Sequence, residues 1–235
     1  MAARLHLLPA WLSEDTAPEV VVPAAVLAKI RTLDTFIVEN AKSARAYLAA
    51  CRHPRPLREL TLLELNEHTP DAAIPGLLDA IATATEAGLL SEAGLPAIAD
   101  PGAALVAAAH ARGMAVIPHV GPSSILLALM ASGLEGQRFR FLGYLPAEAA
   151  ARRARLPEIE RDSIASRETQ IFIETPYRND ALLADVLHSC RAATRLAVAA
   201  DLTSPKEWIR SDSVEAWRSQ PATLGKRPAI FLLLG

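Results

Sequence analysis

Short apolar runs alternate along this chain with longer segments that have helical periodicity. The apolar runs are bounded by turn-forming residues, as is typical of buried strands. They predict strands over residues 4–8, 35–38, 115–118, 138–143, 169–174, 195–200 and 229–234. The periodic segments predict helices over 23–31, 41–51, 74–87, 103–112, 123–132 and 179–191. Strands that alternate with helices predict an α/β fold with mostly parallel sheets.

The segment HVGPSS (119–124) predicts a boundary between two domains. Gly121 and Pro122 favour a turn there, and Ser123 or Ser124 can cap the helix that follows. About half of the chain lies on each side, with its own strands and helices. We therefore expect two α/β domains with a cleft between them, over residues 1–119 and 120–235.

Composition narrows the class of protein without identifying its partner. Hydrophobic residues make up 51% of the chain and charged residues 21%, which indicates a globular protein. The formal net charge of −2 gives no overall indication of binding to nucleic acid or to an anionic membrane. The two cysteines, Cys51 and Cys190, are not spaced as metal ligands, so we expect reduced thiols and a cytoplasmic protein.

The first apolar run is short and is interrupted by Pro9. It is too short for the core of a signal peptide and far too short to span a bilayer. We expect a buried first strand here and no membrane association.

Several familiar catalytic motifs are missing from the sequence. It contains no GxGxxG, GxxxxGK[ST], GxSxG or HExxH pattern, and its six histidines are scattered. The spacing therefore supports neither a Rossmann-type dinucleotide site, nor a P-loop, nor a serine hydrolase, and we expect no metal.

The segment SEAGLPAIADPG (91–102) is a long loop before a predicted helix. Its small residues would let a ligand approach the backbone closely, and Pro96 and Pro101 would stiffen it. Asp100 is placed to cap the following helix. Long ordered loops are often functional, but the composition alone fits a stiff, self-packed loop equally well.

The same loop carries a family resemblance, together with Val120-Gly121-Pro122-Ser123, Ser132-Gly133-Leu134, RFLGYLP (140–146) and Glu174-Thr175-Pro176-Tyr177-Arg178. These segments resemble the tetrapyrrole methylase superfamily, the class III S-adenosylmethionine-dependent methyltransferases. The branch that methylates a ribose 2′-hydroxyl in small-subunit ribosomal RNA is the most similar, with its patterns S-D-A-G-x-P-x-I-x-D-P-G and E-S-P-x-R. The resemblance extends over about residues 4–234.

The resemblance implies two α/β domains, a homodimer, and S-adenosylmethionine bound mainly by backbone groups of the long loop. It implies cofactor contacts at twelve positions. These are Pro9, Ser91, Ala93, Gly94, Pro96, Ile98, Asp100, Ser123, Ser124, Gly143, Glu174 and Pro176.

Three segments depart from the family pattern. A small Gly-containing turn usually follows the first strand, whereas this chain has Trp11 in that place. The segment Glu39-Asn40-Ala41-Lys42 stands where the branch has E-D-T-R, and Leu65-Asn66-Glu67-His68-Thr69 stands where it has an H-E-H-N-like segment. The sequence thus resembles a shorter sister group, whose substrate need not be ribosomal RNA.

Methyl transfer from a sulfonium needs a base only when the acceptor is protonated at neutral pH, as a hydroxyl is. Glu39 and His68 are the catalytic candidates, and Lys42, Glu67 and Arg178 are the candidates for substrate contact. All lie at or just after the predicted carboxyl ends of strands, or in a segment matched to the family, where open α/β sheets bind ligands. Surface charges and helix caps are the alternative interpretation of each.

The methyl acceptor is the least determined part of the prediction. Residues 138–167 include seven arginines and four acidic residues. Among the arginines, Arg152, Arg153 and Arg155 would form a patch that contacts phosphates. The alternative is a solvated helical face. Three functions follow: an RNA methyltransferase, which we favour, a methyltransferase of a small molecule such as a tetrapyrrole, and a non-catalytic S-adenosylmethionine-binding protein.

Overall fold

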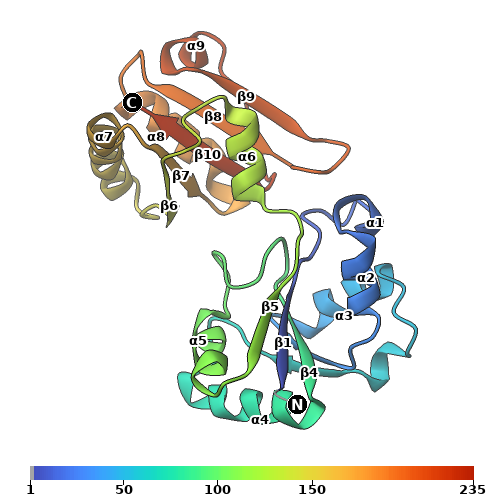
Figure 1. Ribbon diagram of the computed structural model, residues 1–235. Helices are drawn as coiled ribbons and strands as arrows, with labels where there is room; N and C mark the ends of the chain where they lie inside the picture. The colour runs from blue at the N-terminus through green and yellow to red at the C-terminus, as the bar shows by residue number, and fades with distance from the viewer. Residues whose placement is uncertain (1–2) are drawn as a thin grey trace. The chain divides into compact units, whose positions relative to one another are not determined.

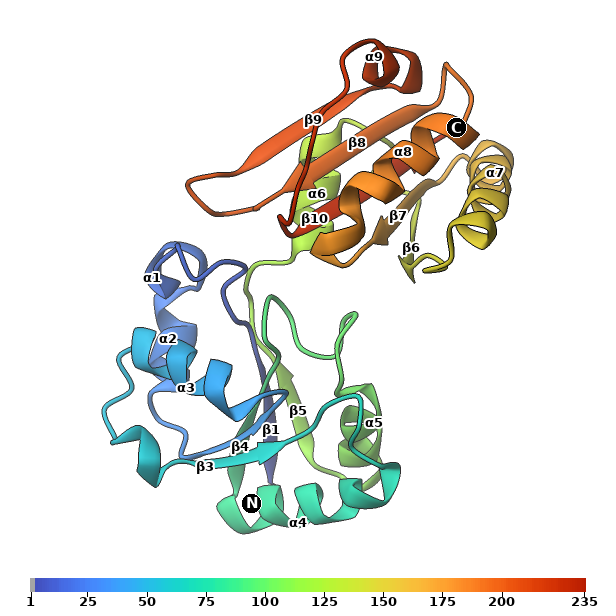
Figure 2. The ribbon, with the colours of Figure 1, turned by 180° about the vertical axis from the view of Figure 1, so that it is seen from behind.

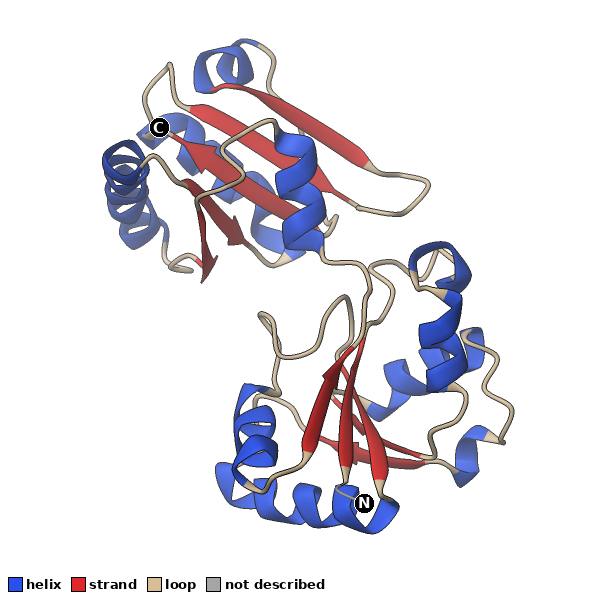
Figure 3. Cartoon of the chain, viewed as in Figure 1, coloured by secondary structure: helices blue, strands red, loops and turns tan. Residues whose placement is uncertain are grey.

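The computed structural model describes residues 3–235, which divide into unit 1, Met1–Ser123, and unit 2, Ser124–Gly235 (Figure 1). The predicted domain boundary at 119/120 lies a few residues before this division. Each unit consists of a five-stranded sheet with helices on both faces (Figure 3).

The sheet of unit 1 is entirely parallel. Its strand order is β3-β2-β4-β1-β5, and each neighbouring pair runs in the same direction. The strands are β1 (Arg4–Leu8), β2 (Thr35–Val38), β3 (Thr61–Glu64), β4 (Glu86–Leu90) and β5 (Ala115–Pro118). All five carboxyl ends therefore meet at one edge of the sheet.

Helices cover both faces of this sheet, so its central strands are continuous apolar runs. Leu8 and Phe36 point to one face and pack with α1 (Pro18–Val21), α2 (Ala24–Ile30) and α3 (Ala41–Ala50). Leu5 and Ile37 point to the other face and pack with α4 (Ile74–Ala84) and α5 (Ala103–Ala111). Two short 3-10 helices, η1 (Leu57–Glu59) and η2 (Asp71–Ala73), complete the connections.

The sheet of unit 2 has the order β6-β7-β10-β8-β9. Its strands are β6 (Phe139–Tyr144), β7 (Thr169–Ile173), β8 (Arg195–Ala200), β9 (Trp208–Ser213) and β10 (Ala229–Leu234). The β6–β7 pair is parallel, while the other three pairs are antiparallel. Helix α6 (Ser124–Ser132) packs on one face, and α7 (Ala149–Ser166), α8 (Asn179–Ser189) and α9 (Val214–Ser219) lie on the other (Figure 2).

The α/β class with two sheets is confirmed, but the expectation of mostly parallel sheets is wrong for unit 2. The prediction missed β9, a polar edge strand that forms a hairpin with β8 through the turn at 201–207. It also missed β3 and β4. Residues 86 and 87 were assigned to the preceding helix, which instead ends at Ala84 because Thr85 has a φ of 65°.

The charged segment at 147–168 forms a single helix, α7, with Pro157 inside it. The alternative expectation of a solvated helical face is wrong for one side of this helix. Arg152, Leu156, Ile159, Glu160 and Ser163 are buried. Burial of the two charged residues on this face is possible because each has a partner in the unit, as described below. Across residues 3–235, none of the helices has both the length and the apolarity needed to cross a membrane.

Candidate active site

The long loop at 91–102 leaves the carboxyl end of β4 and leads into α5, beside the loop that follows β1. The two loops are joined by backbone hydrogen bonds. The Ala10 N–H donates to the Gly94 carbonyl at 2.8 Å, and the Gly94 N–H donates to the Trp11 carbonyl at 3.3 Å. The loop at 91–102 is therefore held in place at Gly94, which has no side chain.

Close packing at this edge leaves no room for larger side chains. Gly94 has a φ of +74°, and a Cβ there would lie 3.2 Å from Leu12 and 3.6 Å from the Pro122 carbonyl oxygen. A Cβ at Gly121 would overlap the Pro9 ring. The structure thus brings together Pro9, Gly94 and the Gly121-Pro122 turn, which lie in three separate segments of the sequence.

Trp11 is anchored on the hydrophobic core of unit 1. Its ring lies edge-on to Tyr47, with centroids 5.4 Å apart, and the Tyr47 hydroxyl donates to the Pro9 carbonyl at 2.8 Å. Burial raises the pKa of Tyr47 well above its usual range, so this hydroxyl stays protonated and keeps its donor role. Trp11 therefore fixes the loop after β1 in place of the small turn found in the family pattern.

The backbone of the loop at 91–102 has a positive φ at two glycines and at two alanines. Ala97 and Ala99 have φ values of 64° and 63°, and Gly102 has a φ of 133°. A left-handed backbone costs about 1–2 kcal/mol for a residue with a Cβ, and such strain is often found at ligand sites. The expectation that Asp100 caps α5 is wrong, because the N-cap is Gly102 and no side chain caps the helix.

Asp100 instead lies near enough to Glu39 and Glu92 for their charges to raise its pKa. The Ser91 hydroxyl donates to the Ala93 carbonyl at 3.3 Å, and the Glu92 carboxylate accepts from the Ser43 hydroxyl at 2.9 Å. Burial, and then the nearby charge of Glu39, raise the pKa of Asp100 to about 6. Burial also raises the pKa of Glu39, and the charge of Glu92 adds to this effect. A cation bound beside these carboxylates would be stabilised.

The other polar candidates of unit 1 lie on the surface. The side chains of Glu67 and His68 are 84% and 86% exposed, and they form an ion pair of 3.5 Å with each other. Lys42 lies exposed in the first turn of α3, with its backbone N–H bonded to the Asn40 side chain. The charge of Glu67 reaches Glu39 and raises its pKa, whereas His68 is not drawn into a buried site.

Ser123 is the last residue of unit 1, and the remaining predicted residues lie in unit 2. All of these except Ser124 lie at or just after the carboxyl ends of the parallel strands β6 and β7. Gly143 has a φ of +69° within an irregularity of β6, and Ser124 begins α6. Glu174 follows β7 directly and is fully buried. Its Oε1 accepts from Arg178 Nη2 at 2.6 Å and from the Thr175 N–H at 2.7 Å. Pro176 and Arg178 lie in η3 (Pro176–Arg178).

The predicted arginine patch on α7 is wrong for Arg152. This side chain is only 4% exposed and makes a buried ion pair with Asp185, at 2.5 Å from Nη2. Arg153 is 54% exposed and bonds to the other oxygen of Asp185 at 2.5 Å, and Arg155 is 40% exposed and pairs with Glu158 at 2.8 Å. A phosphate contact by Arg153 or Arg155 stays a prediction.

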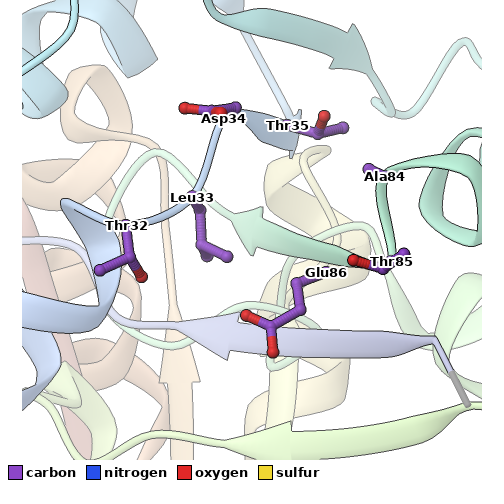
Figure 4. Close-up of a pocket in the computed structure, with 7 residues that line it drawn as sticks. All are labelled: Thr32, Leu33, Asp34, Thr35, Ala84, Thr85 and Glu86. Carbon is purple, nitrogen blue, oxygen red and sulfur yellow. The ribbon is translucent and has the colours of Figure 1, made fainter. Parts of the chain in front are cut away.

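A pocket of about 300 Å³ lies at the opposite edge of the sheet of unit 1 (Figure 4). It is lined by Thr32, Leu33, Asp34, Thr35, Ala84, Thr85 and Glu86. These residues precede or begin β2 and β4, so the pocket is at the amino ends of the strands. Glu86 is engaged by Arg4 at 2.7 Å and by Lys29 at 3.1 Å. The pocket therefore does not belong to the loops described above.

Across residues 3–235, no group of three or more His, Cys, Asp or Glu side chains is arranged to hold a metal ion. Cys51 and Cys190 are free thiols in the hydrophobic cores, and burial raises their pKa values to about 11 and about 12. Thiols protonated to this degree are poor nucleophiles.

No protein-family model matches the chain. It is 34% identical over 194 residues to the ribosomal RNA small subunit methyltransferase I of Xylella fastidiosa, which covers 82% of this chain and 67% of that protein. The same enzyme of Mycobacterium tuberculosis is 33% identical over 211 residues, covering 90% of this chain and 70% of that protein. The chain belongs to the ribosomal RNA small subunit methyltransferase I family.

The structure agrees with this membership of the methyltransferase I family. The crystal structure of the methyltransferase CobJ aligns with a TM-score of 0.62, at 18% identity, over 99% of this chain and 92% of that one. This similarity establishes the tetrapyrrole methylase fold. As a member of the methyltransferase I family, the chain is a methyltransferase, and its methyl donor is S-adenosylmethionine.

The residues at the carboxyl edge of unit 1 fit this donor. S-adenosylmethionine carries a positive sulfonium and an ammonium group, and the loop places Glu39, Glu92 and Asp100 close together. It also carries a flat adenine, and Ile98 of the loop is 49% exposed. Small residues and a left-handed backbone would let a ligand approach the main chain of this loop. Ala93 is exposed, and Pro96 is buried. This loop would hold the donor.

Three features were not predicted from the sequence. Gly121 was assigned only to a turn, whereas its missing Cβ is what admits Pro9. Glu92 replaces the Asp of the family pattern, and its carboxylate accepts from the Ser43 hydroxyl at 2.9 Å. Tyr177 was passed over, although an aromatic residue inside a polar turn is an indication of a binding surface.

Proposed function

We propose that this methyltransferase acts on RNA, and specifically on a ribose 2′-hydroxyl of small-subunit ribosomal RNA. The observation that carries the proposal is the half-buried carboxylate of Glu39, which directly follows β2 and lies near Asp100 of the loop at 91–102, in a chain related to enzymes named for that RNA. A hydroxyl acceptor requires a base, and this edge supplies a carboxylate for that role.

Bound S-adenosylmethionine supplies an electrophilic methyl group. The loop at 91–102 binds and orients the donor, since its joining to Ala10 and Trp11 fixes the backbone before binding. Glu39 accepts the proton of the acceptor hydroxyl. Its raised pKa moves it toward the range in which a carboxylate is an effective general base.

Arg178 and Lys42 are the proposed contacts to the RNA backbone. Both side chains are cationic, and Arg178 is oriented by the buried Glu174. Glu67 and His68 are exposed on the loop after β3, and their proposed roles are contacts at the rim of the site. The assignment of Gly143, Glu174 and Pro176 as donor contacts stays a prediction.

We also propose a homodimer in the cytoplasm. The reduced, buried cysteines fit a compartment that keeps thiols reduced. Leu126 and Met130, one turn apart on α6, are 47% and 79% exposed, and two apolar side chains on one helix face support a contact between copies. Sedimentation at micromolar concentration would show a dimer, and a monomer would contradict this part of the proposal.

The direct test is tritium transfer from labelled S-adenosylmethionine into small ribosomal subunits that lack the modification. We expect label in the RNA, and nuclease digestion with mass spectrometry should assign it to a 2′-O-methylated nucleotide. Glu39→Gln should lower the rate by about 100-fold or more, as loss of a general base does, while S-adenosylhomocysteine binds as before.

Two other results would overturn the RNA assignment. Label that enters a metabolite fraction and not RNA would indicate a small-molecule acceptor. An absence of transfer to any fraction, with donor binding intact, would indicate a non-catalytic binding protein.

A further inference from the structure

Tyr177 lies in the 3-10 turn η3, directly after β7, and is 78% exposed. A single exposed ring does not identify a site by itself, so the surroundings of Tyr177 decide what it can do. Arg178 of the same turn and Glu174, which precedes the turn, belong to the family motif, but the motif gives Tyr177 no role.

Two cationic residues lie next to Tyr177, one over its ring and one beside it in the chain. Lys226 Nζ lies 4.8 Å from the centre of the Tyr177 ring, within the range of a cation–π interaction. Lys226 itself is exposed. Arg178 follows Tyr177 in the chain and is 37% exposed, while its Nη2 bonds to the buried Glu174. One ring and two cations thus stand together at the surface of unit 2.

Hydrogen bonds fix the two segments that carry these side chains. The Asp180 carboxylate accepts from the Leu224 N–H at 2.7 Å and from the Gly225 N–H at 3.2 Å. Asn179 Nδ2 donates to the Arg227 carbonyl at 2.6 Å. The segment with Lys226 is therefore tied on both sides to the helix that begins after Tyr177. A ligand that binds here loses little entropy in ordering the protein.

We propose that Tyr177, Lys226 and Arg178 form a platform for single-stranded RNA. One unpaired base stacks on the Tyr177 ring, on the face that Lys226 leaves open, and the two cations bind the flanking phosphates. Aromatic stacking accepts any base, and single-stranded RNA is usually recognised through stacked bases beside a cationic backbone contact. The platform deepens the proposed function and rests on its assumption that the acceptor is RNA.

Binding of two labelled oligonucleotides tests the platform without requiring methyl transfer. One is a single-stranded RNA of about twelve nucleotides, and the other is an abasic ribose-phosphate strand of the same length. By fluorescence anisotropy, Tyr177→Ala should weaken binding of the RNA by roughly 5- to 100-fold and leave the abasic strand unaffected. Tyr177→Phe, which keeps the ring, should bind both strands as the wild type does.

Lys226→Ala should weaken binding of both strands and lower the slope of log K against log salt by about 0.7, the value for one lost phosphate contact on a single strand. Arg161→Ala is the matched control, because it removes one exposed cation of α7 in the same unit and should change neither affinity by more than about twofold.

The outcomes separate the platform from the proposed function. Equal binding of RNA by Tyr177→Ala and the wild type, or no RNA binding by the wild type, would overturn the platform. If the wild type methylates ribosomal RNA while Tyr177→Ala binds it normally, the platform alone fails. If stacking depends on Tyr177 while no RNA is methylated, the platform stands and the proposed acceptor fails.

Discussion

The two units use their sheets in different ways. In unit 1 all five strands are parallel, so every strand delivers its carboxyl end to the same edge. In unit 2 only β6 and β7 share a direction, and the candidate residues Gly143 and Glu174 come from the ends of those two strands. The candidate site residues therefore lie where neighbouring strands are parallel, because the loops that follow a parallel pair of strands meet at one edge of the sheet.

The units also differ in what holds their elements together. Unit 1 depends on close approach of backbones, as at Gly88 and Gly121, where a Cβ would meet neighbouring side chains. Unit 2 contains buried charges, with Arg152 paired to Asp185 and Glu160 bonded to Thr194 and to the Arg191 N–H. Substitutions should consequently destabilise the two units by different mechanisms, through steric overlap in unit 1 and through an unpaired buried charge in unit 2.

The largest expected effect is in unit 2. Asp185→Ala leaves the Arg152 guanidinium buried without its counter-charge, which typically costs about 3–5 kcal/mol. Urea unfolding should show this loss in the free energy of unfolding. Arg155→Ala, which breaks the exposed pair with Glu158, should cost at most about 1 kcal/mol. Similar losses for the two variants would contradict the distinction between buried and exposed pairs.

An intermediate effect is expected in the core of unit 1. A Cβ at Gly88 would lie 2.5 Å from the Leu8 side chain and 2.9 Å from the Phe36 side chain, and both of these residues are fully buried. Gly88→Ala should therefore destabilise the protein by about 1–3 kcal/mol through overpacking. Gly76→Ala offers a control in the same unit, because nothing lies within 4 Å of its Cβ position. Equal stability of the two variants would mean that the sheet can expand at β4.

The smallest effect concerns the carboxylates of unit 1 and depends on pH. The pKa of Asp100 is about 6 in the folded protein against 3.8 for an ordinary Asp, so between these values the folded state binds more protons. The contribution of Asp100 to stability therefore falls as pH rises from about 4 to about 6, and stays low above that. Asp100→Asn should gain about 1 kcal/mol over the wild type at pH 7.5 and nothing at pH 3.5. The same gain at both values would exclude the charge of Asp100 as the cause.

The expected parallel strand direction is confirmed in unit 1 and wrong in unit 2, and the missed strands have a physical reason. Strands such as TFIV (35–38) are buried on both faces and are recognisable from apolar residues alone. Strand β9, WIRSDS, has no such run, since all of its residues are half-buried at the edge of a sheet. Strand direction cannot be read from composition, so the antiparallel pairs of unit 2 were not predicted.

The candidate site was predictable in part. The long loop and Glu39 were identified from small residues, from strand ends and from a family resemblance, and Glu39 lies near enough to Asp100 of the loop for its charge to raise the pKa of Asp100. Partners distant in sequence were not identifiable, because Arg152 reads as a surface cation until the fold brings Asp185 to it. For the same reason, Tyr177 could not be singled out from the sequence, because Lys226, which lies over its ring, is distant along the chain.

The central claim is that the loop at 91–102 holds the methyl donor, and calorimetric titration of S-adenosylhomocysteine into Gly94→Val tests it most directly. Valine at Gly94 meets Leu12 and the Pro122 carbonyl and must adopt a φ of +74°. Gly76→Val is the matched control, placed where no atom lies within 4 Å. We predict that the wild type and Gly76→Val bind with equal affinity, while a folded Gly94→Val binds at least about 100-fold more weakly. Wild-type affinity in a folded Gly94→Val would contradict the claim.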